Sequence, residues 1–340
     1  MKKRIQSCFS FIAAHQGRFM LGFFIVALVA PLVIPSTYVV RLLVVSLMFT
    51  GLSLSFNLIS GFMGQLSMAH CAFFGVGAYM VAFFTKRFYS IGTIPALLLA
   101  MIAAGLLGLI LALPTLRLKG FYLAIATIGF SEIVRLIMIN ERGLTNGLAG
   151  IFGIPKPVIF GYTISSQTEF YYFVLALVII TNYVVKAVLD SRMGRSIMAI
   201  REDDIAAEAM GIHIFKYKAM TFILSTMLAG LFGGFYAMNL SYIDPTSFTQ
   251  DISMRIMSMT LLGGLGSLPG SYVGSFILSI LPEMTRALST YRYLFYGIVI
   301  VAVMLLKPEG LLGSYNFKYM RQISRAQRTA RKDADAKKGD

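Results

Sequence analysis

The chain has 340 residues, of which 57% are hydrophobic and 13% charged, and its formal net charge is +15. Soluble domains carry about 25% charged residues, and lipid is the solvent that accommodates so much apolar surface. The composition therefore excludes a soluble globular domain and predicts a helical protein that crosses the membrane several times.

Long stretches without Asp, Glu, Lys or Arg run through the chain, and the two longest are 42–85 and 88–116. A helix needs about 20 such residues to cross the hydrocarbon core of a bilayer. We expect an all-α polytopic membrane protein with about ten transmembrane helices, and with eight at the least. The predicted spans are 19–36, 38–59, 66–85, 92–113, 120–140, 170–189, 219–240, 252–266, 270–285 and 292–306.

Basic residues predict the orientation of these spans. A short arm (1–18) and a tail (307–340) flank the transmembrane region (19–306), and the tail holds nine Lys and Arg residues. Loops rich in Lys and Arg remain in the cytoplasm. With the amino terminus inside, alternation of the spans puts 21 basic residues inside and six outside. Both termini are therefore predicted to be cytoplasmic.

The tail faces anionic lipid in this arrangement, so membrane lipid is its expected partner. Its basic residues are not interleaved with aromatic ones beyond Tyr319, so we expect no nucleic-acid partner.

A long loop, GLTNGLAGIFGIPKPVIFGYTISSQTE (143–169), follows the fifth predicted span and falls on the outer face. It exceeds the length of an ordinary connection between helices, which indicates a functional role.

Two segments of the predicted membrane region are rich in glycine. GFMGQLSMAHCAFFGVGAY (61–79) combines four glycines with polar side chains, and GGLGSLPG (263–270) holds four glycines and a proline. The second cannot continue a regular helix, so it predicts either two short spans or a re-entrant pair. The pattern Gly-x-x-Gly-x-Leu occurs in both segments, which suggests two related halves that meet at a solute route.

Polar groups at membrane depth are costly unless they line a pathway, although small residues also serve close helix packing. Both interpretations remain open for these segments. The candidates for the translocation pathway are Gly61, Gly64, Gln65, Ser67, His70, Thr127, Glu132, Asn146, Gly147, Gly263 and Gly264.

Glu132 and Arg135 stand three residues apart in the fifth predicted span, and so on one face of its helix. We expect an ion pair that holds the helix bundle together, with contact to solute as the alternative.

Charge is concentrated in GRSIMAIREDDIAAEAMGI (194–212), which has six charged residues. The acids that open EDDIAAEAMG (202–211) and the glycine that ends it are typical of a short helix outside the membrane. Its alanines leave the backbone near the surface, as a helix that docks in a groove requires. By composition alone, a solvated helix without a partner is the simpler interpretation.

Motifs for catalysis are missing from the sequence. It has no phosphate-binding loop, dinucleotide-binding fingerprint, nucleophile elbow or zinc-protease motif. The two cysteines, Cys8 and Cys71, and the three histidines are scattered, so neither a disulfide nor a metal site is expected. We therefore expect a non-enzymatic chain, with any ATP bound by a partner.

Four stretches combine into a recognisable pattern: GFMGQLSMAHCAFFGVGAY (61–79), LKGFYLAIATIGFSEIVRLI with LTNGLAGIFGIP (118–155), GRSIMAIREDDIAAEAMGIHIFKYKAMTFILSTMLAGLFGGFYA (194–237), and LLGGLGSLPGSYVGSF (261–276) followed by KPEGLLG (307–313). Together and in this order, they resemble the permease subunits of ABC importers for branched-chain amino acids. The elements KGFY (119–122) and TNG (145–147) are similar to the second type of permease in these systems.

This resemblance implies that 194–212 is the cytoplasmic coupling helix that docks in a cleft of an ATPase subunit. The docking residues that it implies are Gly194, Arg195, Arg201, Ala206, Ala209 and Gly211, with Glu202, Asp203 and Asp204 at the rim.

The resemblance also implies an assembly in the bacterial cytoplasmic (inner) membrane. Its other members would be two ATP-binding cassette subunits, a second homologous permease and an extracytoplasmic solute-binding protein. The partner ATPases would use ATP and Mg, and this chain would bind no cofactor.

Two alternatives remain at this point. Relatives with the same layout import urea or other amides, and this chain has SMAHC (67–71) where members often have Ser-Leu-Gly-His-Ala. A secondary transporter driven by an ion gradient is the other alternative, although Glu132 is the one acid well inside a predicted span.

Overall fold

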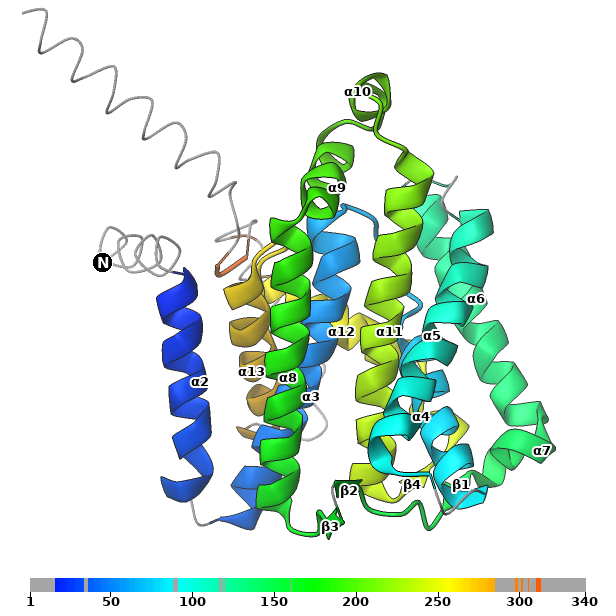
Figure 1. Ribbon diagram of the computed structural model, residues 1–340, viewed down its shortest axis with the longest axis vertical. Coiled ribbons are helices and arrows are strands. Elements are labelled where there is room, and N and C mark those ends of the chain that lie inside the picture. Colours follow the sequence, from blue (N-terminus) through cyan, green and yellow to red (C-terminus); the bar gives the residue numbers. More distant parts are fainter. Residues whose placement is uncertain are drawn as a thin grey trace, which may run out of the picture.

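The structure is a computed structural model, and it describes residues 16–33, 36–87, 91–115, 118, 120–159, 161–284, 297–298, 301, 305 and 310–312. Helices arranged side by side make up most of the described chain (Figure 1). The longer ones are α2 (Gln16–Val33), α3 (Thr37–Asn57), α4 (His70–Arg87), α5 (Thr93–Thr115), α6 (Phe121–Asn140), α8 (Gln167–Asp190), α9 (Arg192–Glu202), α11 (Ile214–Leu240), α12 (Gln250–Gly263) and α13 (Leu268–Met284).

Shorter elements join these helices. They are the π-helical turn η1 (Leu58–Phe62), α7 (Arg142–Thr145), η2 (Gly147–Ala149), α10 (Asp204–Ala209), η3 (Pro245–Ser247), β1 (Ile151–Phe152), β2 (Val158–Ile159), β3 (Tyr162–Thr163) and β4 (Tyr242–Ile243).

Five helical stretches of the described chain are long and apolar enough to cross a membrane: Thr37–Phe62, Thr93–Thr115, Phe121–Asn140, Gln167–Asp190 and Ile214–Leu240. Two shorter apolar helices, Gly22–Val33 and Leu268–Leu281, lie beside them. The chain is thus a polytopic helical membrane protein. The span predicted at 292–306 and the tail lie almost entirely outside the described residues, as does most of the amino-terminal arm.

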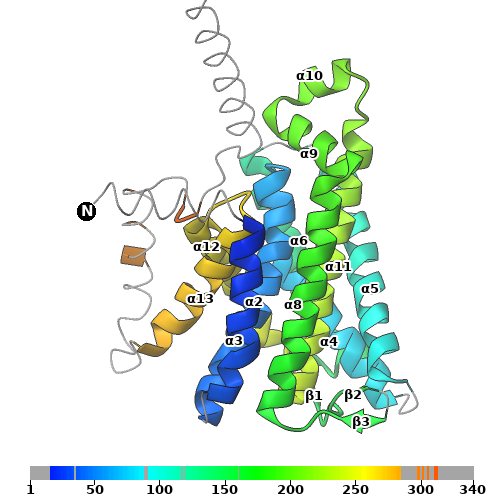
Figure 2. The same ribbon diagram turned by 60° about the vertical axis from the view of Figure 1, so that its left-hand side comes forward.

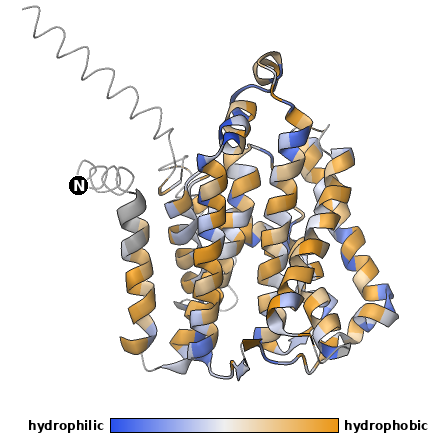
Figure 3. Ribbon diagram, in the orientation of Figure 1, coloured by the Kyte–Doolittle hydropathy of each residue, from blue (hydrophilic) through white to orange (hydrophobic). Residues whose placement is uncertain are grey.

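The two ends of the bundle differ (Figures 1 and 2). Helices α9 and α10 project beyond the long helices at one end, and the four short strands lie at the opposite end. Figure 3 shows hydrophilic residues concentrated at these two ends, with mainly hydrophobic helices between them. This is the distribution expected when lipid surrounds the middle of the molecule and water both ends.

Small residues place α11 at the centre of the described helices. A Cβ added at Gly233 would collide with the carbonyl oxygen of Phe74, and one at Gly77 with that of Gly230. Without side chains at these positions, the backbones of α4 and α11 approach closely, which is how helices gain packing contacts within a membrane.

The span predicted at 66–85 starts too early. Residues 63–69 are not helical, and α4 begins at His70. Gly64 has a positive φ of 74°, and the backbone of Met68 bonds to side chains instead of a helix. Its N–H donates to Thr127 Oγ1 at 2.9 Å, and its carbonyl oxygen accepts from Gln250 Nε2 at 2.9 Å. These two bonds satisfy the backbone where the helix is interrupted.

The predicted break in GGLGSLPG is confirmed. Helix α12 ends at Gly263, α13 begins at Leu268, and Gly264 and Gly266 between them have φ values of 121° and 75°. At 1.5 Å per residue, the 14 residues of α12 are about 21 Å long, less than a full crossing. The chain therefore turns back here. Both predicted arrangements, two short spans or a re-entrant pair, require such a turn.

The all-α expectation is incomplete at the end opposite α9 and α10. In the loop 143–169 and just after α11, β1 pairs antiparallel with β4, and β2 with β3. Gly150 is required beside β4, because its φ is 70° and a Cβ there would collide with the carbonyl oxygen of Ile243. The loop satisfies part of its backbone by pairing within itself and with residues 242–243, which residue composition alone did not reveal.

Candidate functional site: the helix pair α9 and α10

The projecting end is built from two helices rather than the one predicted at 202–211. Asp203 has an extended backbone and separates α9 from α10. Its Oδ1 accepts hydrogen bonds from the backbone N–H groups of Ile205 at 2.8 Å and Ala206 at 3.1 Å. Asp203 is therefore the N-cap of α10. Asp203 thus marks the bend between two helices, and its expected place at the rim of a docking surface stays a prediction.

Helix α9 begins at a tight turn after α8. Ser191 caps it, because its Oγ accepts from the N–H groups of Met193 at 3.1 Å and Gly194 at 3.4 Å. A Cβ at Gly194 would collide with the backbone of Leu189, so only glycine permits this turn. Ile197 and Ile200 are buried on the inner face of α9. Gly194 is thus buried and allows the tight turn between α8 and α9, whereas Arg195 is exposed.

Gly211 ends α10 as the sequence predicts. Its φ is 81°, its N–H donates to the carbonyl oxygen of Glu208 at 2.9 Å, and the N–H of Ile212 donates to that of Ala207 at 3.1 Å. This pair of bonds is a Schellman motif, which satisfies the last carbonyl groups of a helix.

Helix α10 exposes apolar side chains at the projecting end. Ile205 is 77% exposed and Met210 83% exposed, and the predicted docking residues Ala206 and Ala209 are exposed with them. Sequence reasoning missed Ile205 and Met210, since it gave weight to the charges and alanines around them. Their position outside the predicted spans was the available signal, because large apolar side chains in water mark a binding surface.

Two basic side chains connect this pair to the bundle. Arg201 Nη1 donates to the carbonyl oxygen of Gly61 at 2.5 Å. Lys218, which is buried in α11, forms an ion pair with Asp204 of α10 at 3.1 Å. Arg201 and Asp204, predicted for docking, therefore also have partners within the chain.

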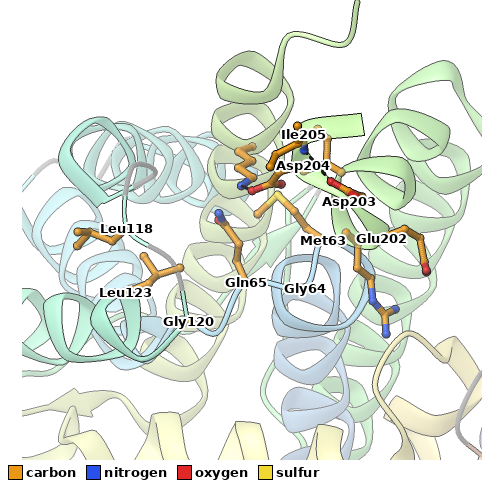
Figure 4. A pocket seen from close by; sticks show the side chains of 13 residues that line it. Met63, Gly64, Gln65, Leu118, Gly120, Leu123, Glu202, Asp203, Asp204 and Ile205 are labelled. Carbon is orange, nitrogen blue, oxygen red and sulfur yellow. Dashed lines mark hydrogen bonds and ion pairs between the residues drawn. The ribbon is translucent and has the colours of Figure 1, made fainter. Parts of the chain in front are cut away.

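A cavity of about 310 Å³ lies between the helix pair and the bundle. Met63, Gly64 and Gln65 line one side of it, and residues 200–205 line the other (Figure 4). Gln65 Oε1 is buried and has no hydrogen-bond partner among the described residues. The structure thus brings two predicted groups together, Gly64 and Gln65 of the pathway set and the acids of 194–212.

The two glycine-rich segments also meet. Asn57, fully buried in α3, donates through Nδ2 to the carbonyl oxygen of Ser267 at 3.0 Å. Its Oδ1 accepts from the N–H of Gly266 at 2.8 Å. A Cβ at Gly61 would collide with Asn57 and with the nitrogen of Gly266, so the helix break beside η1 packs against the turn between α12 and α13. Gly263 and Gly264 belong to this turn.

Deeper polar candidates surround the start of α4. His70 is fully buried, and its Nε2 lies 3.3 Å from Ser225 Oγ of α11. Thr127 bonds to Met68, and Ser67 Oγ is buried without a partner in the described chain. Their role in solute passage remains a prediction.

Asn146 and Gly147 lie far from this group, at the end that carries the strands. Asn146 has a left-handed backbone with a φ of 62°, and its Nδ2 donates to the carbonyl oxygen of Gly150 at 2.9 Å. Gly147 follows with a φ of 59°. The two residues shape the turn that leads into β1.

The predicted ion pair between Glu132 and Arg135 is present, with Arg135 Nε donating to Glu132 Oε2 at 2.9 Å. It does not brace the bundle, because both partners belong to α6 and their side chains face outward. Glu132 is 49% exposed and Arg135 25% exposed. Residues three apart meet along one helix, and nothing in that spacing determines which way the pair faces.

This architecture defines a class of protein. It is a polytopic helical membrane protein with broken helices in the interior of the bundle and a short helix pair, with exposed apolar side chains, that projects from one end. The family model described as Branched-chain amino acid transport system / permease component matches residues 38–304. The chain therefore belongs to this family of permease components, which confirms the resemblance inferred from its motifs. It is a transport component and not an enzyme.

Two groups of relatives refine this placement. The chain is 31% identical over 320 residues to the high-affinity branched-chain amino acid transport system permease protein LivM of Salmonella typhimurium, covering 87% of this chain and 75% of the relative. LivM of Escherichia coli K12 gives the same identity and coverage, 31%, 87% and 75%. The permease protein LivH of Salmonella typhimurium is 25% identical over 77% of this chain and 90% of its own length. The chain is thus LivM-like, which confirms the predicted second-permease type. No solved structure matches it.

Proposed function

We propose that this chain imports branched-chain amino acids across the bacterial inner membrane with energy from ATP, which two partner subunits bind and hydrolyse. The names of its LivM and LivH relatives support the substrate, and they support a second homologous permease as partner. The single observation that carries the coupling role is the helix pair α9 and α10, which projects from the bundle with apolar side chains at its tip.

Docking on an ATPase subunit would bury Ile205 and Met210. Both side chains are more than three-quarters exposed, and Ala206 and Ala209 beside them allow a partner to approach the backbone. Apolar anchors surrounded by charged residues are typical of the energetic centre of a protein interface. Glu202 and Glu208 supply such a charged surround on this helix pair.

The charge distribution supports a cytoplasmic position for this end. Arg192, Arg195, Arg201, Lys216 and Lys218 all belong to α9 or to the start of α11. Basic residues of this kind remain on the cytoplasmic side of a membrane. The strands then face the outside, where a solute-binding protein would deliver its cargo. We retain eight to ten spans, an amino-terminal arm (1–18) and a basic tail (307–340), with both termini cytoplasmic.

The outer face of α6 is the proposed contact with the second permease. It exposes Phe121, Ile133 and Ile137 by more than half of their surfaces, together with the ion pair of Glu132 and Arg135. Charged groups are expensive in contact with lipid, so they mark surfaces that another protein or a water-filled pathway covers. Glu132 would then lie at the boundary between the two permeases, and Thr127, Gln65, Ser67 and His70 behind it.

The decisive experiment measures uptake of radiolabelled leucine and urea by cells with and without the gene for this chain. We expect deletion to abolish leucine uptake that is sensitive to ATP depletion by arsenate, and to leave urea uptake unchanged. Loss of urea uptake alone would contradict the proposed substrate. Loss of uptake that follows the proton gradient, with ATP held constant, would contradict the ATP-driven mechanism.

Docking is tested separately with Ile205→Asp and Met210→Asp. We expect each variant to accumulate in the membrane and to lose co-purification of the ATPase subunits, because a carboxylate would be buried at the interface. Glu208→Gln at the rim is the matched control and should retain the ATPases. Full retention by both aspartate variants would contradict docking at this tip.

A further inference from the structure

Arg201 connects α9 to the place where α3 and its continuation η1 end. It lies in the last turn of α9, and its guanidinium donates from Nη1 to the carbonyl oxygen of Gly61, 140 residues away in sequence. Gly61 belongs to η1, the π-helical turn that continues α3. Carbonyl groups at the end of a helix have no partner within that helix and attract a cation. Arg201 therefore caps the broken helix from another element.

Close packing at the same point limits how far Arg201 can move independently. Gly64 has a φ of 74°, and a Cβ there would lie 2.9 Å from Arg201 Cγ. On its other side, the break packs against the turn between α12 and α13 through Gly61, Asn57 and Gly266. The side chain of Arg201 is thus in direct contact with the backbone of 61–64.

The non-helical segment 63–69 extends this connection into the bundle. Its Met68 bonds to Thr127 of α6 through the N–H and to Gln250 of α12 through the carbonyl oxygen, both at 2.9 Å. Gln250 also accepts from Ser131 Oγ of α6 at 2.9 Å. The segment 61–68 is therefore hydrogen-bonded at both ends, to Arg201 of α9 at Gly61 and to α6 and α12 at Met68.

The other basic link, Lys218 with Asp204, ties α10 to α11 on the far side of the cavity. Figure 4 shows Gln65 directed towards Asp204 across this space. The cavity of about 310 Å³ leaves room for the helix pair to move against the segment 63–69. Gln65 Oε1, which borders this space, has no hydrogen-bond partner among the described residues.

We infer that Arg201 is a positioning residue of the transport cycle, which converts movement of α9 and α10 into movement of the helix break at 61–69. This inference rests on the proposed docking of α10 and assigns Arg201 a task inside the chain, distinct from contact with the ATPase. In this account the tip of α10 binds the ATPase subunit. When the helix pair moves, Arg201 moves the polar groups around α4, α6 and α12 with it.

The test uses the complete transport system in membrane vesicles and measures leucine moved per ATP hydrolysed. Arg201→Met keeps an unbranched apolar stem and removes the positive charge and the donors of the side chain. We expect ATPase subunits to co-purify normally and ATP hydrolysis to continue, while leucine transported per ATP falls about tenfold, within the range of coupling between distant sites. Lys216→Met, which removes one positive charge from an exposed site at the same end, should keep the normal ratio.

Gly64→Ala provides an independent variant, because it leaves Arg201 in place and adds a methyl group against its side chain. It should lower the transport ratio in the same way. Gly161→Ala controls for backbone strain, since Gly161 has a φ of 83° but no atom within 4 Å of an added Cβ.

Two results would overturn the inference. One is loss of ATPase co-purification in Arg201→Met, which would make Arg201 a docking residue. The other is a normal transport ratio in both Arg201→Met and Gly64→Ala. Failure of docking itself would be seen elsewhere, as retention of the ATPases by Ile205→Asp and Met210→Asp.

Discussion

Helices α11 and α6 are both long and apolar enough to cross the membrane, yet they meet different surroundings. In an apolar stretch of 18 residues, 72% of α11 is buried within the chain, whereas 33% of α6 is buried. Glycines and serines of α11 pack against α4, α5 and α3, while α6 turns large apolar side chains and an ion pair outward. Small residues thus identify the interior helix, and the outward ion pair of α6 supports the proposed contact of this helix with a second permease.

The largest expected effect follows from filling the contact between α4 and α11. Gly233→Leu would drive a side chain into the backbone of Phe74. We expect a loss of more than about 4 kcal/mol in stability, enough to prevent accumulation of folded protein. Size-exclusion chromatography of a fluorescent fusion measures the folded amount. Normal accumulation of Gly233→Leu would mean that α4 and α11 do not pack as described.

Reversing one charge on α6 tests the other side of the comparison. Glu132→Arg should leave the chain in the membrane but abolish co-purification of the second permease, because two adjacent cations would occupy the proposed interface. The double variant Glu132→Arg with Arg135→Glu restores the pair. We expect it to recover about 1–3 kcal/mol of association, which a double-mutant cycle measures. Equal co-purification by the single and double variants would exclude this face as the interface.

A smaller effect is expected from Ser225→Ala in α11. Ser225 Oγ donates to the carbonyl oxygen of Ser55 and lies 3.3 Å from His70 Nε2, so its loss deprives two buried groups of a partner. We expect a loss of about 1–3 kcal/mol in stability, seen as earlier thermal unfolding in detergent. An unchanged unfolding temperature would show that α11 does not depend on this contact.

The smallest effect is expected from Gly129→Ala in α6. An added Cβ has no atom within 4 Å, so the methyl group meets no part of this chain. Thermal unfolding of the isolated permease should be unchanged or slightly later, because alanine favours a helix by up to about 1 kcal/mol over glycine. Earlier unfolding would show that α6 is more closely packed within the chain than its exposure indicates.

Several elements followed from sequence patterns with small errors at their ends. The spans predicted at 120–140 and 170–189 are Phe121–Asn140 and Gln167–Asp190 in the structure. Hydropathy predicts such helices well, because no backbone group can remain unpaired in lipid and a helix pairs its own. The break between α12 and α13 was equally predictable from its glycines and proline.

Other elements depended on contacts between distant residues. The late start of α4 and the bend at Asp203 each follow from hydrogen bonds that hydropathy does not record. The strands opposite α9 and α10 have only two residues each, too few for any periodic pattern. Ile205 and Met210 were missed because their importance depends on exposure.

The sequence by itself determined the membrane class, the family, most helices and the position of the charged segment 194–212 outside the spans, because these depend on composition and on local motifs. The tertiary structure decided which faces are interior, that Arg201 reaches Gly61, and that the ion pair of α6 turns outward. The reason is physical. Hydropathy and spacing constrain how each segment folds on itself, whereas burial and long-range hydrogen bonds arise only when segments far apart in the chain pack together.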